Sequence, residues 1–386
     1  MAACDLPGEF EVRPGPRLVV GPGTLGRLGT LARELGAVRA LVVSDLGIVA
    51  AGHADAAIES LAAAGVAAAV FSAFGENPTT DDVAAGAVAA REFRPDLLVG
   101  LGGGSSMDCA KGINFLFSCG GRMQDYRGRD STPAPMLPSI AVPTTAGTGS
   151  ETQSFALVSD PATGLKMACG AAGAAFRIAI LDVDLTLTQP LSLVALTGID
   201  ALSHAVESHV SRAATPASRL FSRAAFRLLA TNLPDVFADG GTIAARSAVQ
   251  FGAALAGLAI ENSMLGAAHA LANPLTAAHH VAHGQAVGLM LPHVVRFNGA
   301  VCGPAYADLL GEIGTACESD SAAEWLATWL ADLLARSRLA TTLTAARVAA
   351  PDTAPLAAQA AAQWTAGFNP RPVTAADLAL LYEAAR

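Results

Sequence analysis

The residues best suited to chemistry lie in the stretch 197–209, TGIDALSHAVESH, in which Asp200 and His204 are four residues apart. The apolar pattern around them predicts a helix. Residues four apart on a helix point the same way, with about 5–6 Å between their Cβ atoms, so this pair could bind one metal ion. His269 and His283 would complete a set of one carboxylate and three imidazoles, which suits Fe(II), Zn or Ni.

A carboxylate and a histidine with this spacing also occur together by chance, usually as a surface pair or as a core histidine satisfied by other side chains. The run 283–293, HGQAVGLMLPH, is apolar, so His283 is expected to be buried rather than solvated. A buried imidazole needs a polar partner. This requirement favours a metal site, although the residues alone leave both interpretations open.

The first half of the chain alternates apolar strands with helical segments. Expected strands are 17–20, 39–43, 66–71 and 96–101, with helices at 51–64 and 80–93. Such alternation predicts a parallel sheet covered by helices.

The strand at 96–101 runs directly into a glycine-rich turn, GGGSSMDCAKGINF. The glycines at 102–104 allow a ligand to approach the backbone closely, and Ser105 or Ser106 could cap the following helix. Such a turn directs N–H groups at an anion such as a pyrophosphate. A second turn of this kind, AVPTTAGTGSE at 141–151, makes a dinucleotide site a better interpretation than two simple tight turns.

Asp45 lies just after the strand at 39–43, at the position where α/β dinucleotide folds hydrogen-bond the adenosine ribose. A carboxylate there would repel a 2′-phosphate, which predicts NAD rather than NADP. The alternative is that Asp45 only caps the turn that follows.

Beyond Pro190 the strands stop and Ala/Leu-rich segments predict an all-helical domain. We therefore expect an α/β domain at 1–187 and a helical domain at 188–386. The expected helices are 191–211, 215–232, 242–264, 265–278, 284–298, 304–316, 321–337, 353–366 and 374–385. Because the metal candidates lie in one half and the cofactor turns in the other, the sequence predicts a site between the halves.

Bulk composition excludes several classes of protein. The net charge of −9 argues against a nucleic-acid binder. No uninterrupted apolar run of spanning length and no signal peptide are apparent, so no membrane association is expected. Six cysteines without CxxC pairing are typical of a reduced, cytoplasmic enzyme. Lys111 and Lys166 are the only lysines among 24 basic residues. Either these positions require a compact ammonium, or two lysines remain by chance.

Five motifs together resemble the iron-containing (group III) alcohol dehydrogenases, whose relatives include glycerol dehydrogenase and dehydroquinate synthase. The resemblance covers essentially the whole chain. The motifs are GGGSSMDCAK (102–111), PTTAGTGSE (143–151), GIDALSHAVE (198–207), HALANPL with HHVAHG (269–284) and NPRPVT (369–374).

The resemblance implies a Rossmann-like domain with a parallel sheet, an all-helical domain, and a small alcohol or aldehyde as substrate. It implies NAD, and Fe(II) with Zn as the alternative, in a homodimer or larger homo-oligomer. The implied metal ligands are Asp200, His204, His269 and His283. The implied cofactor residues are Asp45, Asn77, Gly103, Gly104, Ser105, Ser106, Thr144, Thr145 and Lys166.

One departure from the family pattern concerns proton handling. Asn273 stands where many members carry a second histidine, and an amide cannot titrate. His280, three residues before His283, becomes the candidate catalytic residue, with a purely structural role as its alternative.

The mechanism implied by the family is polarisation of the alcohol oxygen by the metal and hydride transfer to the nicotinamide. Two other classes remain. A lyase of the dehydroquinate synthase type would need a dense cationic pocket, and the helical half contains no lysine. A redox sensor that has lost turnover would bind NADH without oxidising alcohols.

Overall fold

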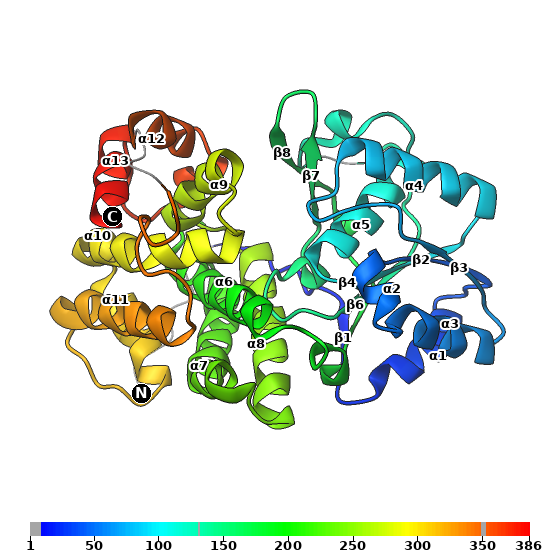
Figure 1. Ribbon diagram of the computed structural model, residues 1–386, viewed down its shortest axis with the longest axis horizontal. Coiled ribbons are helices and arrows are strands. Elements are labelled where there is room, and N and C mark those ends of the chain that lie inside the picture. Colours follow the sequence, from blue (N-terminus) through cyan, green and yellow to red (C-terminus); the bar gives the residue numbers. More distant parts are fainter. Residues whose placement is uncertain (1–8, 130–131, 349–352) are drawn as a thin grey trace. The chain divides into compact units, whose positions relative to one another are not determined.

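The computed structural model describes residues 9–129, 132–348 and 353–386, which form two compact units (Figure 1). Residues 15–189 form the α/β unit. Residues 190–386 form the helical unit, and the segment that ends at Pro14 groups with them. This segment is held by Asn262, whose side chain accepts from Arg13 N at 2.6 Å and donates to Arg13 O at 3.0 Å.

The α/β unit is built on one six-stranded sheet with the order β1-β9-β6-β4-β2-β3. All of its strand pairs are parallel, which confirms the predicted class of sheet. The strands are β1 (Arg17–Val20), β2 (Arg39–Val43), β3 (Ala67–Phe71), β4 (Leu97–Gly102), β6 (Ser139–Pro143) and β9 (Ile178–Leu181).

Helices cover both faces of this sheet because alternate side chains of each strand point to opposite faces. Ala40 and Val42 of β2 belong to the core shared with α1 (Leu28–Glu34) and α3 (His53–Ala63). Leu41 and Val43 belong to the core on the other face. That face carries α4 (Thr80–Phe93) and α5 (Gly104–Ser118), while the short α2 (Leu46–Ala50) follows β2.

A second, three-stranded sheet was not predicted from the sequence. It has the order β5-β8-β7, with β5 (Gly128–Arg129), β7 (Phe155–Asp160) and β8 (Leu165–Gly170), and β7 packs on α5. The antiparallel β7–β8 hairpin turns at DPATG, where Asp160 Oδ1 accepts from Ala162 N at 3.0 Å. An Asp–Pro…Gly turn between two runs of alternating polarity was the available signal.

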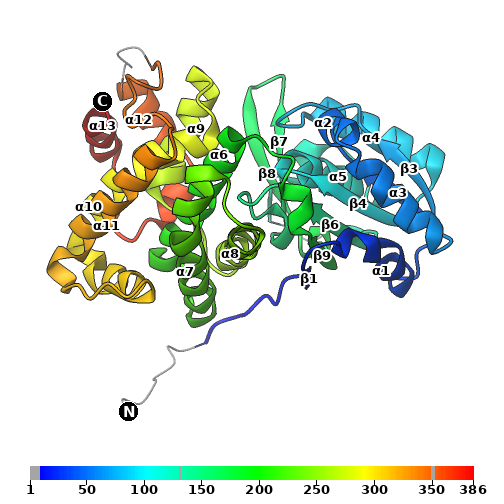
Figure 2. The same ribbon diagram turned by 60° about the horizontal axis from the view of Figure 1, so that its bottom comes forward.

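The helical unit is organised around α6, which packs against α7, α8 and α10 (Figure 2). This confirms the all-helical class predicted for the second half. Its helices are α6 (Leu191–Val210), α7 (Pro216–Asp239), α8 (Ile243–Glu261), α9 (Ala267–His279), α10 (His283–Glu312), α11 (Ser319–Arg336), α12 (Thr353–Ala361) and α13 (Ala375–Ala384).

The expected break between helices 284–298 and 304–316 is wrong, because the single helix α10 continues through residues 299–303 and ends at Glu312. A Cβ on Gly303 would collide with the carbonyl oxygen of Ser319, and one on Gly299 would lie 2.7 Å from Ala323 Cβ. The glycines near Pro304 therefore allow α11 to pack closely against α10 instead of ending the helix.

One helix among the described residues, α8, is long and apolar enough by length and composition alone to cross a membrane. Most of it is buried within the protein, a property that core helices share.

Candidate functional site

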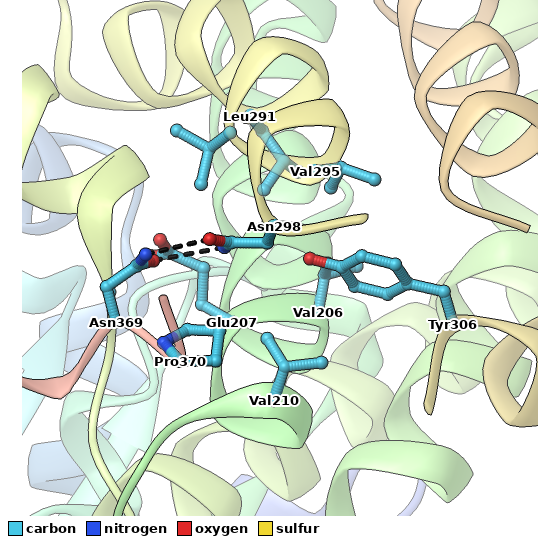
Figure 3. Close-up of a pocket in the computed structure, with 11 residues that line it drawn as sticks. Val206, Glu207, Val210, Leu291, Val295, Asn298, Tyr306, Asn369 and Pro370 are labelled. Atoms are coloured by element: carbon cyan, nitrogen blue, oxygen red, sulfur yellow. Dashed lines mark hydrogen bonds between the residues drawn. The ribbon is translucent and has the colours of Figure 1, made fainter. Parts of the chain in front are cut away.

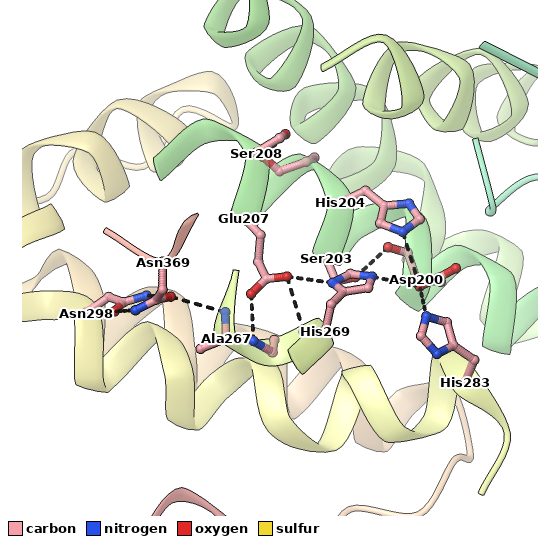
Figure 4. Close-up of polar contacts among 12 residues, drawn as sticks. Asp200, Ser203, His204, Glu207, Ser208, Ala267, His269, His283, Asn298 and Asn369 are labelled. Atoms are coloured by element: carbon pink, nitrogen blue, oxygen red, sulfur yellow. Dashed lines mark hydrogen bonds and ion pairs between the residues drawn. The ribbon is translucent and has the colours of Figure 1, made fainter. Parts of the chain in front are cut away.

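The four predicted metal ligands converge in the helical unit, around one carboxylate oxygen (Figure 4). Asp200 Oδ1 lies 3.5 Å from His204 Nε2, 3.5 Å from His269 Nε2 and 3.8 Å from His283 Nε2. The rings of His204 and His269 are stacked, with centroids 4.9 Å apart. Four polar side chains from three helices therefore face a common point.

The backbone brings these ligands together at two places. Asp200 and His204 lie one turn apart on α6, as their spacing predicted. His283 is the first residue of α10, and the start of that helix lies directly on α6, because a Cβ on Gly284 would collide with the carbonyl oxygen of Leu196. Gly284 thus allows the approach that places His283 beside Asp200.

The cluster favours positive charge at its centre. Burial by itself raises the pKa of the Asp200 carboxyl, but the three surrounding histidines outweigh it and hold that pKa well below its usual range. Burial lowers the pKa of His269, whereas the neighbouring carboxylates of Asp200 and Glu207 raise it to about 9. The negative charges of Asp200 and Glu207 thus favour positive charge on or beside the His269 ring.

The donor set fits a divalent metal ion. Asp200, His269 and His283 each offer one ligand atom, and these atoms lie within 4.8 Å of one another. Asp200 Oδ1 and His269 Nε2 are buried, and neither has a hydrogen-bond partner among the described residues. Buried polar atoms without such a partner are costly, and coordination by one carboxylate and several imidazoles would satisfy them.

Glu207 is a site residue that the sequence reasoning missed. It is 3% exposed, and its Oε2 accepts a 2.5 Å hydrogen bond from His269 Nδ1. This bond fixes the proton on Nδ1 and leaves Nε2 facing Asp200, as in the carboxylate–histidine pairs that orient metal ligands. The available signal was position, since Glu207 lies three residues after His204 on the same helix.

The glycine-rich turn after β4 differs from expectation in its capping. Helix α5 begins at Gly104 with Gly103 as N-cap and has no side-chain cap, so the expected cap from Ser105 or Ser106 is wrong. Ser105 Oγ instead accepts from Asn77 N at 3.2 Å, and Ser106 Oγ donates to Asp45 at 3.2 Å. The first turn of α5 therefore lacks a side-chain acceptor of its own, as an anion-binding helix start requires.

Asp45 does cap the helix that follows it. Its Oδ1 accepts from Gly47 N at 2.9 Å and from Ile48 N at 3.1 Å, while Oδ2 accepts from Ser106 Oγ. Capping accounts for one carboxylate oxygen, and the side chain stays partly exposed at the carboxyl end of β2. The capping and ribose-binding interpretations are therefore compatible.

The second predicted cofactor turn packs against the first. Thr144 N donates to Gly102 O at 2.9 Å, and a Cβ on Gly104 would lie 2.9 Å from Thr148 Cγ2. A Cβ on Gly103 would lie 3.3 Å from Thr145 Cγ2. The glycines therefore serve contact between the two turns as well as any ligand.

Asn77 and Lys166, far apart in sequence, meet beside Ser105. Lys166 Nζ donates to Asn77 Oδ1 at 2.9 Å. Lys166 is exposed on β8, and Asn77 has a left-handed backbone with φ 55°. The structure thus brings an exposed ammonium and an amide to the start of α5.

The other lysine, Lys111, is a buried structural residue. Its Nζ donates to Ser150 O at 2.7 Å, Ser150 Oγ at 2.9 Å and Phe155 O at 2.7 Å, and lies 4.0 Å from Asp108 Oδ1. The side chain is 2% exposed. A compact ammonium suits this enclosed set of acceptors, so Lys111 holds the end of the second turn to α5.

His280 and Asn273 differ in exposure and in position on α9. His280 is the exposed C-cap of the helix, with a left-handed φ of 54°, and its ring makes no hydrogen bond to any residue the structure describes. Asn273 lies one turn after His269, and its Nδ2 donates to Gln363 Oε1 at 3.1 Å. Asn273 is therefore held by a neutral partner.

Comparison with known proteins identifies the family. Residues 15–183 match the family model "Iron-containing alcohol dehydrogenase", and residues 194–386 match "Fe-containing alcohol dehydrogenase family, C-terminal". The chain therefore belongs to the iron-containing alcohol dehydrogenases, and it is an NAD-linked, metal-dependent oxidoreductase.

Individual relatives agree with this assignment. The chain is 35% identical to the NAD-dependent methanol dehydrogenase of Bacillus methanolicus over 80% of this chain and 82% of that protein. A solved 1,3-propanediol oxidoreductase superimposes with a TM-score of 0.95 at 31% identity, covering 98% of this chain and 100% of the other. Sulfoacetaldehyde reductase from Bifidobacterium kashiwanohense, solved with NAD⁺, gives a TM-score of 0.88 at 27% identity, covering 98% of both chains.

Proposed function

We propose that Asp200, His204, His269 and His283 hold the divalent metal, Fe(II) with Zn as the alternative, at which this dehydrogenase oxidises a small alcohol or reduces the corresponding aldehyde. The observation that carries the proposal is the buried Asp200 Oδ1, which three imidazoles approach within 3.8 Å. The direct test is NADH formation by anaerobically iron-loaded enzyme with a panel of short alcohols. Steady turnover excludes a sensor that only binds NADH, and the absence of turnover with every alcohol would contradict the proposal.

The residues of the helical unit bind and orient the reactants. When bound, the metal would supply a Lewis acid for the substrate oxygen. The expected burial of His283 is wrong, because its side chain is 36% exposed, whereas those of the other three proposed ligands are only 5–8% exposed. We infer that substrate reaches the cluster from the His283 side, and that the buried side excludes water.

The α/β unit would bind NAD through Asp45, Asn77, Gly103, Gly104, Ser105, Ser106, Thr144, Thr145 and Lys166. Supporting this, the uncapped start of α5 suits a pyrophosphate. Lys166 Nζ lies at the same helix start through its bond to Asn77, where it can contribute a positive charge toward an anionic ligand.

Replacing Asp45 with Asn should relax the preference for NADH over NADPH. Asn caps helices as well as Asp, so α2 should be retained while the charge near the ribose is removed. We expect the ratio of kcat/KM for the two cofactors to fall about tenfold, which corresponds to roughly 1.4 kcal/mol. Asp55→Asn, an exposed acid on α3, is the matched control. A wild type that uses both cofactors equally, or an unchanged ratio in the variant, would show that Asp45 only caps.

We further propose that His280 handles the alcohol proton in place of the histidine that Asn273 replaces. General acid–base groups typically contribute about 10²–10⁴-fold, so His280→Ala should lower kcat by a factor in that range. The neighbouring exposed His279→Ala is the control. A deuterated alcohol must first show a kinetic isotope effect, because slow product release would hide the change. Equal rates for the two variants would assign His280 a structural role.

The remaining parts of the proposal concern the cell and the assembly. We propose that the enzyme works in the cytoplasm as a homodimer or larger homo-oligomer, on short alcohols or aldehydes such as those in the names of its relatives. The five free cysteines among the described residues support a reducing compartment. Light scattering of the purified protein tests the assembly.

A further inference from the structure

The start of α9, the helix that carries His269, is capped by two residues from elsewhere in the helical unit. The N-cap residue, Gly266, provides no side-chain cap. Ala267 N donates to Asn369 Oδ1 at 3.2 Å, and Ala268 N donates to Glu207 Oε1 at 2.7 Å. An uncapped helix start leaves several N–H groups without acceptors. Here Asn369 of the C-terminal NPRPVT segment accepts from one of them, and Glu207 of α6 accepts from two, since its Oε2 also accepts from His269 N at 3.4 Å.

Asn369 is held rigidly because its amide uses its full hydrogen-bonding capacity. Its Nδ2 donates to Asn298 Oδ1 at 2.8 Å and to Arg371 O at 2.7 Å, and its Oδ1 also accepts from Asn298 Nδ2 at 3.1 Å. Figure 3 shows the two amides facing each other, with Glu207 beside them. Asn298 and Asn369 are 2% and 1% exposed. Water therefore does not compete for these bonds.

The C-terminal segment is also held from the side of Arg371. The guanidinium of Arg371 lies 3.8 Å from the ring centroid of Phe297 on α10 and donates to Phe297 O at 2.9 Å. This contact and the Asn298–Asn369 pair join the segment to two consecutive residues of α10. Asn369 therefore links α10, which carries His283, to the first turn of α9, which carries His269.

We propose that Asn369 is a positioning residue for the metal centre. Asn369 fixes the first turn of α9, while Glu207 fixes both that turn and the His269 ring through its 2.5 Å bond to Nδ1. The inference rests on the proposed metal role of His269. It gives the NPRPVT motif, 100 residues beyond His269 in the sequence, the function of setting metal affinity without touching the metal.

Gly266 provides an independent way to disturb this contact. A Cβ at this position would lie 2.9 Å from Glu207 Oε1 and 3.1 Å from Asn369 Oδ1. Both atoms are ends of side chains, so Gly266→Ala should displace them while leaving the surrounding helices in place. Weaker metal binding is thus expected both from Gly266→Ala and from loss of the Asn369 side chain.

The experiment measures Fe²⁺ binding to apo-enzyme under anaerobic conditions, in competition with a chromogenic chelator. Partners that orient metal ligands typically contribute about 10–100-fold in affinity, so we expect Asn369→Ala and Gly266→Ala each to raise the Fe²⁺ Kd by about tenfold or more. Asn262→Ala is the matched control. Asn262 is a buried amide of the same unit whose side chain makes three hydrogen bonds, to Arg13 and Leu258. The Fe²⁺ Kd of this variant should stay within about twofold of wild type, because, among the residues that the structure describes, the side chain of Asn262 shares no hydrogen-bond partner with Asn369 or Glu207.

The outcomes separate this inference from the proposed function. If wild type binds one Fe²⁺ per chain and Asn369→Ala and Gly266→Ala bind it as tightly, the positioning role is overturned while the metal site stands. If wild type binds no Fe²⁺, the proposed function itself fails. If Asn262→Ala weakens binding as much as Asn369→Ala, the effect is general destabilisation and the inference fails. Should Asn369→Ala not fold, Asn298→Ala decides, because it removes two of the four hydrogen bonds of the Asn369 side chain and none of those made by Glu207 to α9.

Discussion

Asp200→Ala should abolish stoichiometric metal binding and nearly all turnover. The variant loses the only carboxylate of the four proposed ligands and the one oxygen that all three imidazoles approach. A Lewis-acid metal contributes several kcal/mol to transition-state stabilisation, and about 1.36 kcal/mol corresponds to a factor of ten. We therefore expect kcat/KM to fall by about 10³ or more. Metal content is measured by elemental analysis of anaerobically purified protein, and turnover by NADH formation.

The control for this prediction is Asp235→Ala, which removes an exposed carboxylate from α7 in the same unit. That variant should retain one metal per chain and wild-type turnover. Circular dichroism of Asp200→Ala must show native helix content, so that loss of metal is not loss of fold. A folded Asp200→Ala protein that keeps one tightly bound metal would refute the assignment of this cluster.

The proximity of Asp200 and His204 could be predicted because its signal is local. Asp200 and His204 are one helical turn apart, so their proximity follows from helix geometry. Even there, residue type alone is insufficient. His209 lies on the same helix five residues further, and its Nδ1 shares a 2.9 Å hydrogen bond with Ser222 Oγ. It is a core histidine, and its pKa is lowered to about 4 by burial and by the charges of Arg219 and Arg223.

The parts that escaped prediction depend on contacts between distant segments. Glu207 and Asn369 act on α9 from positions 62 and 102 residues away. Neither distance leaves a periodic signal. The break predicted in α10 is wrong for a related reason. Gly299 and Gly303 allow α11 to approach α10 closely, and they do not form a turn. Glycine marks a close approach, and the sequence does not say what approaches.

Replacement by methionine should strongly lower the stability of the protein at Lys111 and leave it nearly unchanged at Lys166. Lys111→Met removes an ammonium that donates to Ser150 and Phe155 and neighbours the Asp108 carboxylate. Breaking a buried pair by removing one partner typically costs about 3–5 kcal/mol, and we expect a loss of that size in the free energy of unfolding by urea. Lys166→Met is the matched control. Lys166 is exposed, so its loss should change stability by no more than about 0.5 kcal/mol, with its effect confined to cofactor binding.

The pH dependence of the Lys111→Met variant should reveal the cause of its instability. Burial raises the pKa of the Asp108 carboxyl, and Lys111 partly offsets that rise. Without Lys111 the folded-state pKa should rise further above the unfolded value of about 3.9. At acid pH the carboxyl is protonated in both the folded and the unfolded state, so its raised pKa costs no stability. Stability then falls as the pH rises from the pKa of the unfolded state to the pKa of the folded state. The difference from wild type should therefore be smaller at acid pH than at neutral pH.

A second substitution separates charge from hydrogen bonding. In Lys111→Met/Asp108→Asn the uncompensated carboxylate is gone, while an amide oxygen can still accept from Ser150 Oγ, which donates to Asp108 at 2.6 Å. Because the lone buried charge is the costly part, the double variant should recover much of the lost stability. Its remaining difference in stability from wild type should no longer depend on pH. If it is no more stable than Lys111→Met, the loss comes from the acceptors Ser150 O and Phe155 O. Lys111 would then act mainly as a hydrogen-bond donor to the second cofactor turn.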